Sequence, residues 1–181
     1  LSSIEGVLLF DTVHDRGLYK LIQVATAFTA AALLAVFIAV LTRDRRLGLL
    51  ALFLAIPGFQ LRYWYDPIHS FGLLLPSLTI KIFGSLVLVL IGLRTASNRR
   101  AHGLFLAGGL LWTAALLQYE IAFVVSPLVL VVLWHERASG RKKRWAAGTA
   151  ILLPTFVLAN YIVTLRSSAN PSPGYTTNWA L

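Results

Sequence analysis

Long apolar stretches without charge constrain this chain more than any other feature of its sequence. The residues from Leu21 to Leu41 include no charged side chain, and about 20 such residues cross a bilayer as an α-helix. Because lipid offers no hydrogen-bond partners, a spanning segment must pair its own backbone groups, as a helix does. Charged residues form only 13% of the chain, whereas about 25% is typical of soluble domains. We therefore predict an all-α, polytopic integral membrane protein.

The remaining apolar runs determine the predicted number of spans. Four more runs follow the first, at residues 47–61, 71–93, 103–134 and 145–165. As one helix, the 103–134 run would be about 48 Å long, against a hydrocarbon core of about 30 Å. We expect it to form two spans that turn near Gln118, Tyr119 and Glu120. The prediction is a transmembrane helix bundle of about six spans, some short or broken, in a single domain over residues 1–181.

The basic residues are concentrated in alternate loops. Eleven of the 16 lysines and arginines lie in three loops, at residues 43–46, 94–102 and 135–144. An excess of this kind marks cytoplasmic loops, so we predict that these loops share the cytoplasmic side and that the chain starts outside. The net charge of +9 then reflects topology, and we expect no nucleic-acid binding. The intervening outer segments hold only four basic residues, Arg16, Lys20, Arg62 and Arg166.

The acidic residues show the opposite distribution. Only Asp44 and Glu136 fall on the predicted inner side. Chemistry that needs a carboxylate is therefore expected at the extracytoplasmic face. The five acidic residues on that face are Glu5, Asp11, Asp15, Asp66 and Glu120.

A polar and aromatic segment at residues 62–70 combines side chains suited to an anionic lipid headgroup. Arg62 and His69 can pair with a phosphate, and Asp66 can bind a hydroxyl or accept a proton. Tyr65 ends a run of three aromatic residues between them. The simpler interpretation is an aromatic belt at the membrane surface followed by an Asp-Pro turn. The sequence leaves both interpretations open.

Two ionisable residues lie within apolar sequence. A carboxylate at Glu120 is costly unless it is paired or hydrated, so this residue is either functional or exposed at a tight outer turn. Lys81 lies about ten residues into its span. It either extends its alkyl stem toward the membrane surface or faces the interior, where it would meet Glu120 or a phosphate.

Several kinds of site are excluded. The chain has no cysteine, so it cannot form a disulfide, a thiol nucleophile or a cysteine-bound metal site. It lacks a Gly-rich phosphate loop, a His-Glu-x-x-His metal motif and a Gly-x-Ser-x-Gly nucleophile elbow. No cofactor or metal ligand set is identified, and the need for a divalent metal stays open. Methionine is absent and residue 1 is leucine, so we expect a fragment of a longer protein, incomplete at least at the N-terminus.

Two short motifs resemble bacterial GT-C type integral-membrane glycosyltransferases, relatives of the protein O-mannosyltransferases and the lipid A aminoarabinose transferases. The first is Arg-Tyr-Trp-Tyr-Asp-Pro at residues 62–67, and the second is Leu-Gln-Tyr-Glu-Ile-Ala at residues 117–122. The likeness extends over about residues 17–175. It implies transfer of a sugar from a polyprenyl-phosphate donor to an acceptor on the extracytoplasmic face of the bacterial inner membrane.

The resemblance also bears on the site residues. The hallmark catalytic acids of the family lie in the first outer loop, which we expect to precede Leu1, so their role is not assigned to Asp11 or Asp15. On chemical grounds Asp66 and Glu120 are the candidate catalytic residues. The candidate substrate-binding residues are Arg62, Tyr65, His69, Lys81 and Arg166.

The expected partners are the lipid-linked sugar donor and membrane lipid. Two alternatives remain open. One is a fragment of a polytopic transporter or permease, in which Lys81 and Glu120 line a path. The other is an envelope polysaccharide ligase or polymerase. The sequence does not indicate an oligomeric state.

Overall fold

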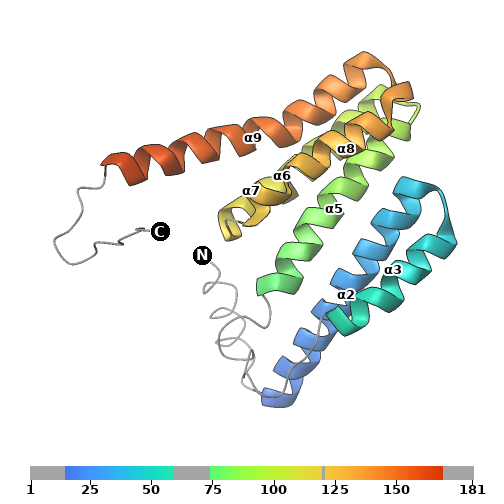
Figure 1. The fold of residues 1–181 in the computed structure, drawn as a ribbon, viewed down its shortest axis with the longest axis vertical. Coiled ribbons are helices and arrows are strands. Elements are labelled where there is room, and N and C mark those ends of the chain that lie inside the picture. Colours follow the sequence, from blue (N-terminus) through green and yellow to red (C-terminus); the bar gives the residue numbers. More distant parts are fainter. Residues whose placement is uncertain (1–14, 59–73, 120, 169–181) are drawn as a thin grey trace, which may run out of the picture.

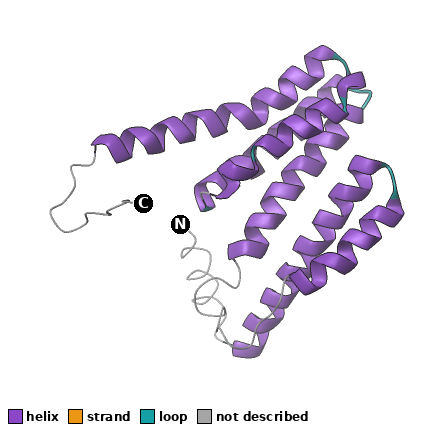
Figure 2. Ribbon diagram, viewed as in Figure 1, coloured by secondary structure: helices purple, strands orange, loops and turns teal. Residues whose placement is uncertain are grey.

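A computed structural model of the chain describes residues 15–58, 74–119 and 121–168 (Figure 1). Within these ranges every regular element is helical, and no strand is present (Figure 2). The all-α prediction is therefore confirmed for the described residues. The elements are α2 (Arg16–Thr42), α3 (Arg45–Gly58), α5 (Leu74–Arg94), α6 (Asn98–Gln118), α7 (Ile121–Val125), α8 (Pro127–His135), the 3-10 turn η1 (Arg137–Ser139) and α9 (Arg141–Ser168).

Four of the described helices are long and apolar enough to cross a membrane. One shorter apolar segment is Ala122–His135. Helix α3 has 14 residues and extends about 21 Å, and the count of about six spans stays a prediction. Large apolar side chains are exposed on these helices, including Phe53 at 70% and Val124 at 76%, as expected where lipid covers the surface. The four long segments are Gly17–Thr42, Leu75–Arg94, Asn98–Gln118 and Arg141–Leu165.

The 103–134 run is divided as predicted. Helix α6 ends at Gln118, Tyr119 has extended backbone geometry (φ −157°, ψ 137°), and α7 begins at Ile121. Pro127 is the first residue of α8, a position where the missing proline N–H costs no helical hydrogen bond. Helices α7 and α8 run back toward the end of the bundle at which α6 began (Figure 1).

Helix α5 lies at the centre of the bundle. It packs against α6 on one side and α2 on the other, while α2 pairs with α3 and α9 contacts α6 (Figure 1). Leu86, Val89 and Leu90 of α5 are fully buried. Phe37 of α2 packs against Phe83 of α5 with 5.3 Å between the ring centroids. The core therefore follows one apolar face of α5 through the length of the bundle.

A close contact between α6 and α9 depends on a glycine and a proline. Pro154 lies inside α9, and because it has no N–H, the carbonyl of Ala150 lacks its usual helical hydrogen bond. Gly109 of α6 packs against this carbonyl, so closely that a Cβ atom there would lie 2.7 Å from the oxygen. Nearby, Trp112 Nε1 donates to Thr155 Oγ1 at 2.9 Å. Small residues allow membrane helices to approach in this way.

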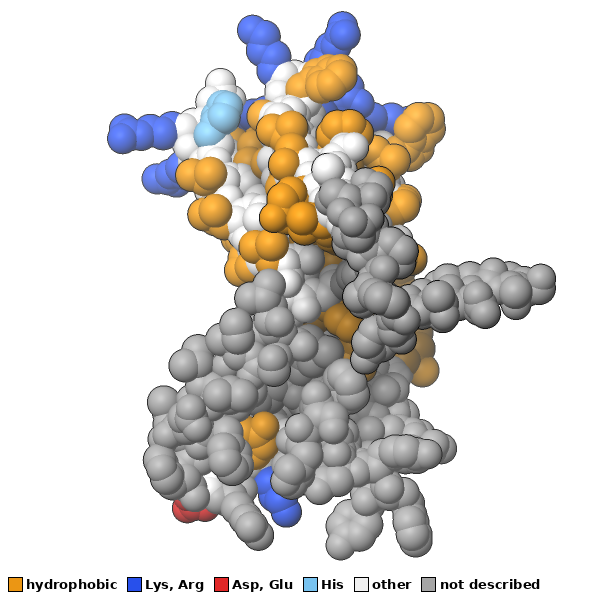
Figure 3. Space-filling model, turned by 90° about the vertical axis from the view of Figure 1, so that its left-hand side faces the viewer, with side chains coloured by type: hydrophobic (Ala, Val, Ile, Leu, Met, Phe, Trp, Pro, Cys, Tyr) orange, Lys and Arg blue, Asp and Glu red, His pale blue; other side chains and the backbone are white. Residues whose placement is uncertain are grey.

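The three basic loops lie at one end of the bundle, which we call the basic end (residues 43–46, 94–102 and 135–144). Arg94 Nη1 donates to the carbonyl oxygen of Val40 at 2.6 Å, which joins the ends of α5 and α2. Lys143 Nζ donates to the carbonyl oxygen of Thr95 at 2.6 Å, which joins the start of α9 to the α5–α6 turn. Lys and Arg side chains gather around this end in Figure 3. The predicted grouping of the loops is confirmed, and their cytoplasmic side stays a prediction.

Candidate functional site

Lys81 forms a polar cluster at the other end of the bundle, which we call the Lys81 cluster (Ser77, Lys81 and Gln118). Lys81 lies seven residues after the start of α5, about 10 Å along the helix axis. Its Nζ donates to Ser77 Oγ at 3.0 Å and to Gln118 Oε1 at 2.5 Å. The Gln118 amide nitrogen donates in turn to Ser77 Oγ at 3.2 Å. All three side chains are half-buried.

Helix geometry explains this meeting. Ser77 and Lys81 are four residues apart on α5 and so share one face of it. Gln118 is the last residue of α6, and α5 and α6 are antiparallel neighbours (Figure 1), so the end of one lies beside the start of the other. The Lys81 side chain therefore points toward α6 and does not extend toward the membrane surface. An ionisable side chain held inside a membrane helix pair is a candidate functional group.

Most of the sequence-predicted site residues lie outside the described part of the chain. This applies to the candidate catalytic residues Asp66 and Glu120. It also applies to the candidate substrate-binding residues Arg62, Tyr65 and His69. Arg166 belongs to α9, but its side chain is not among those described. Within the described residues, no group of three or more His, Cys, Asp or Glu side chains could hold a metal ion.

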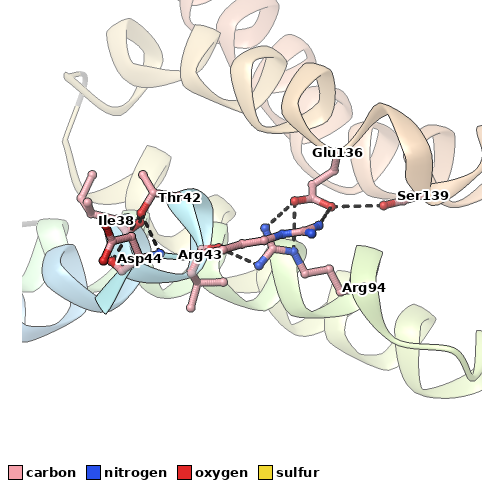
Figure 4. A network of polar contacts seen from close by, with 8 residues as sticks. Ile38, Thr42, Arg43, Asp44, Arg94, Glu136 and Ser139 are labelled. Carbon is pink, nitrogen blue, oxygen red and sulfur yellow. Dashed lines mark hydrogen bonds and ion pairs between the residues drawn. The ribbon is translucent and has the colours of Figure 1, made fainter. Parts of the chain in front are cut away.

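A second polar group, the Glu136 cluster (Arg43, Arg94, Glu136 and Ser139), joins the loops of the basic end (Figure 4). The Glu136 side chain is only 4% exposed. Its Oε1 accepts hydrogen bonds from Arg94 Nε at 3.0 Å and from Arg94 Nη2. Its Oε2 lies 4.0 Å from Arg43 Nη2 and accepts from Ser139 Oγ at 3.4 Å. One carboxylate thus connects the α2–α3 turn, the end of α5 and the α8–α9 turn.

Opposing effects act on the pKa of the Glu136 carboxyl. Burial raises this pKa, because it disfavours the charged form. The hydrogen bond from Arg94 and the positive charges of Arg94, Arg43 and His135 lower it, and together they hold the pKa below its usual value. Glu136 is therefore ionised at neutral pH. Because Arg94, Arg43 and Ser139 already contact its oxygens, its evident role is to hold the loops together.

The sequence did not predict this cluster. In the sequence, Glu136 is one of two acidic residues on the predicted inner side, and Arg94 belongs to a basic loop. The available signal was a single carboxylate placed directly after an apolar run and surrounded by basic residues. Such a carboxylate needs a cationic partner if the fold buries it, but spacing along the chain does not identify which cation.

Comparison of the chain with protein-family models, with curated protein sequences and with solved structures gave no match.

Proposed function

We propose that this chain is part of a membrane glycosyltransferase that moves a sugar from a polyprenyl-phosphate donor to an acceptor on the extracytoplasmic face of a bacterial inner membrane. The observation that carries the proposal is the Lys81–Gln118 contact. Helix α5 follows the first motif of the glycosyltransferase resemblance, and Gln118 belongs to the second. The contact therefore brings together elements adjacent to both motifs, at the end of the bundle opposite the basic loops.

The chemistry assigns a role to each group. A carboxylate, Asp66 or Glu120, accepts the proton of the acceptor hydroxyl as its oxygen bonds to the anomeric carbon. The bond between that carbon and the donor phosphate oxygen breaks, and the phosphate leaves with the electron pair. The Lys81 ammonium stabilises this departing negative charge, and Arg62, His69 and Arg166 are further candidates for the same task. Tyr65 is the candidate sugar contact.

Transfer of sugar per mole of folded protein, measured in membranes of the full-length protein with a lipid-linked donor, tests the proposal. Asp66→Asn or Glu120→Gln should lower turnover by about 10²-fold if that residue is the base. Lys81→Met should also lower turnover, because the cation for the leaving phosphate is lost. Lys20→Met is the matched control, since Lys20 is an exposed lysine of α2 that lies outside the cluster. Unchanged activity in both carboxylate variants would remove those residues from the mechanism.

A transporter would give a different result. Lys81 in the α5–α6 interface is also compatible with a substrate path. In that case the membranes would transfer no sugar, and Lys81→Met would instead alter solute uptake.

The predicted orientation can be tested separately, because the chain contains no cysteine. Ala138 at the basic end and Lys20 near the start of α2 are both exposed. In intact cells an impermeant thiol reagent should label Lys20→Cys and leave Ala138→Cys unlabelled. The reverse pattern would place the Lys81 cluster on the cytoplasmic side and contradict the proposed extracytoplasmic site.

A further inference from the structure

The basic end has far more exposed cations than exposed carboxylates. Of its two acidic residues, Glu136 is buried against Arg94, and Asp44 accepts a hydrogen bond from the backbone N–H of Arg46 at 2.8 Å. Among the described residues, only Arg43 of the exposed cations forms an ion pair. The protein therefore leaves most of this positive surface unneutralised. The eight exposed cations are Arg43, Arg45, Arg46, Arg99, Arg100, Arg137, Arg141 and Lys142.

Two tryptophans lie beside these cations where α8 meets α9. Trp134 is 73% exposed and Trp145 is 66% exposed. The Arg137 guanidinium lies over the Trp134 ring, with 6.0 Å between its Cζ and the ring centroid. Arg141 and Trp145 are four residues apart in α9, so they share one face of the helix. Trp134 is thus in contact with Arg137, and Trp145 shares a helical face with Arg141. We call this group, with Lys142, the α8–α9 corner (Trp134, Arg137, Arg141, Lys142 and Trp145).

The order of side chains leading to the corner matches the order of groups in a phospholipid. Leu130 and Val131 of α8 are more than half exposed and present aliphatic surface. Trp134 follows at the end of the helix, and tryptophan favours the region between acyl chains and headgroups. Arg137 comes next, where it can pair with a phosphate. A soluble polyanion could pair with the cations, but it would make no contact with the tryptophan or with the aliphatic surface.

We propose that the α8–α9 corner binds the headgroups of anionic phospholipids in preference to neutral ones. The phosphate and its negative charge contact Arg137, Arg141 and Lys142, while Trp134 and Trp145 pack against the glycerol and upper acyl region. This site is independent of the proposed sugar transfer, because it lies at the opposite end of the bundle from the Lys81 cluster. The remaining apolar surface of the protein does not distinguish anionic from neutral lipids, whereas the α8–α9 corner does.

Native mass spectrometry of the full chain released from nanodiscs containing equal amounts of phosphatidylglycerol and phosphatidylcholine tests this. The wild type should retain phosphatidylglycerol preferentially. Each cation near a membrane surface changes anionic-lipid affinity by about five-fold. Lys142→Gln should therefore reduce the preference by up to about that factor, and Arg137→Gln combined with Arg141→Gln and Lys142→Gln should reduce it by more than about ten-fold. If the triple variant does not fold, the comparison of Lys142→Gln with the wild type decides the outcome.

Lys20→Gln is the matched control, because it removes one exposed lysine near the start of α2 and should leave the lipid preference unchanged. Three results would overturn the proposal. Equal retention of both lipids by the wild type would show no selectivity. An equal effect of Lys20→Gln and Lys142→Gln would show that net charge, rather than the corner, is responsible. Displacement of phosphatidylglycerol by an RNA oligonucleotide or a soluble acidic peptide would assign the corner to a soluble polyanion.

Discussion

The two ends of the bundle place charged side chains in different surroundings. At the basic end, the Glu136 carboxylate pairs with Arg94 and Arg43 and joins three turns. At the other end, the Lys81 ammonium donates hydrogen bonds to Ser77 of its own helix and to Gln118 of α6. Where helices end, arginine side chains from neighbouring elements can reach a buried carboxylate and pair with it. Within α5, hydrogen bonds to side chains of two helices hold the Lys81 ammonium in place.

This difference separates a structural role from a chemical one. In the Glu136 cluster a buried carboxylate pairs with Arg94 and lies near Arg43, so the removal of these groups should affect stability first. The Lys81 cluster fixes the position of a cation, so its removal should affect activity more than stability. The unfolding free energy of each variant can be measured in detergent micelles by titration with a denaturing detergent.

The largest effect is expected from Arg94→Gln. The variant leaves the buried Glu136 carboxylate without its main cation, and removing one partner of a buried pair costs about 3 kcal/mol of unfolding free energy. Arg43→Gln is the matched variant. Its side chain is 71% exposed and 4.0 Å from the same carboxylate, so the loss should stay below about 0.5 kcal/mol. Equal losses for the two arginines would show that burial does not govern this cluster.

Two glycines of α6, Gly103 and Gly109, test whether the contact between α6 and α9 contributes to the stability of the bundle. Gly109→Ala would place a Cβ atom 2.7 Å from the Ala150 carbonyl oxygen, so α6 and α9 must separate, at a cost of about 2 kcal/mol. Gly103→Ala is the control, because no atom lies within 4 Å of the added Cβ, and it should be neutral or slightly stabilising. If Gly109→Ala is harmless, the close α6–α9 contact contributes little to the stability of the bundle.

The pH dependence of stability sharpens the same comparison. Because folding lowers the pKa of Glu136 from its usual value of 4.5, its contribution is fully present above about pH 4.5. The contribution is lost as the pH falls through the lower, folded-state pKa. The unfolding free energy of the wild type should therefore exceed that of Glu136→Gln near neutral pH, and this difference should shrink in acid. A difference that stays constant from pH 7 to about pH 3 would contradict the assignment.

A small effect on stability is expected from Lys81→Met. The substitution removes an ammonium from an apolar interface, while Ser77 and Gln118 keep their mutual hydrogen bond. We expect the unfolding free energy to change by about 1 kcal/mol or less. A loss as large as that of Arg94→Gln would show that Lys81 is primarily structural and would weaken its proposed role in sugar transfer.

The helices themselves could be predicted from composition along the chain. Apolar runs near the thickness of a bilayer must be helical in lipid, and the structure contains helices over residues 21–41, 74–93 and 145–165, within three of the predicted runs. The excess length of the 103–134 run predicted the break at Gln118. The distribution of basic residues predicted that three loops share one end. Each of these conclusions depends on segment length and charge, which are local properties.

The contacts within the candidate sites were decided by the tertiary structure. Whether Lys81 points to lipid or to α6 depends on the rotation of α5 about its own axis. The packing of the apolar side chains of α5 against α2 and α6 determines that rotation. Which cation meets Glu136 depends on how α2, α5 and α8 end beside one another. Such choices arise from packing between segments far apart in the chain, as at Gly109 and Ala150. Apolar spans have little polar patterning to encode these choices locally, so the partners appear only when the helices are assembled.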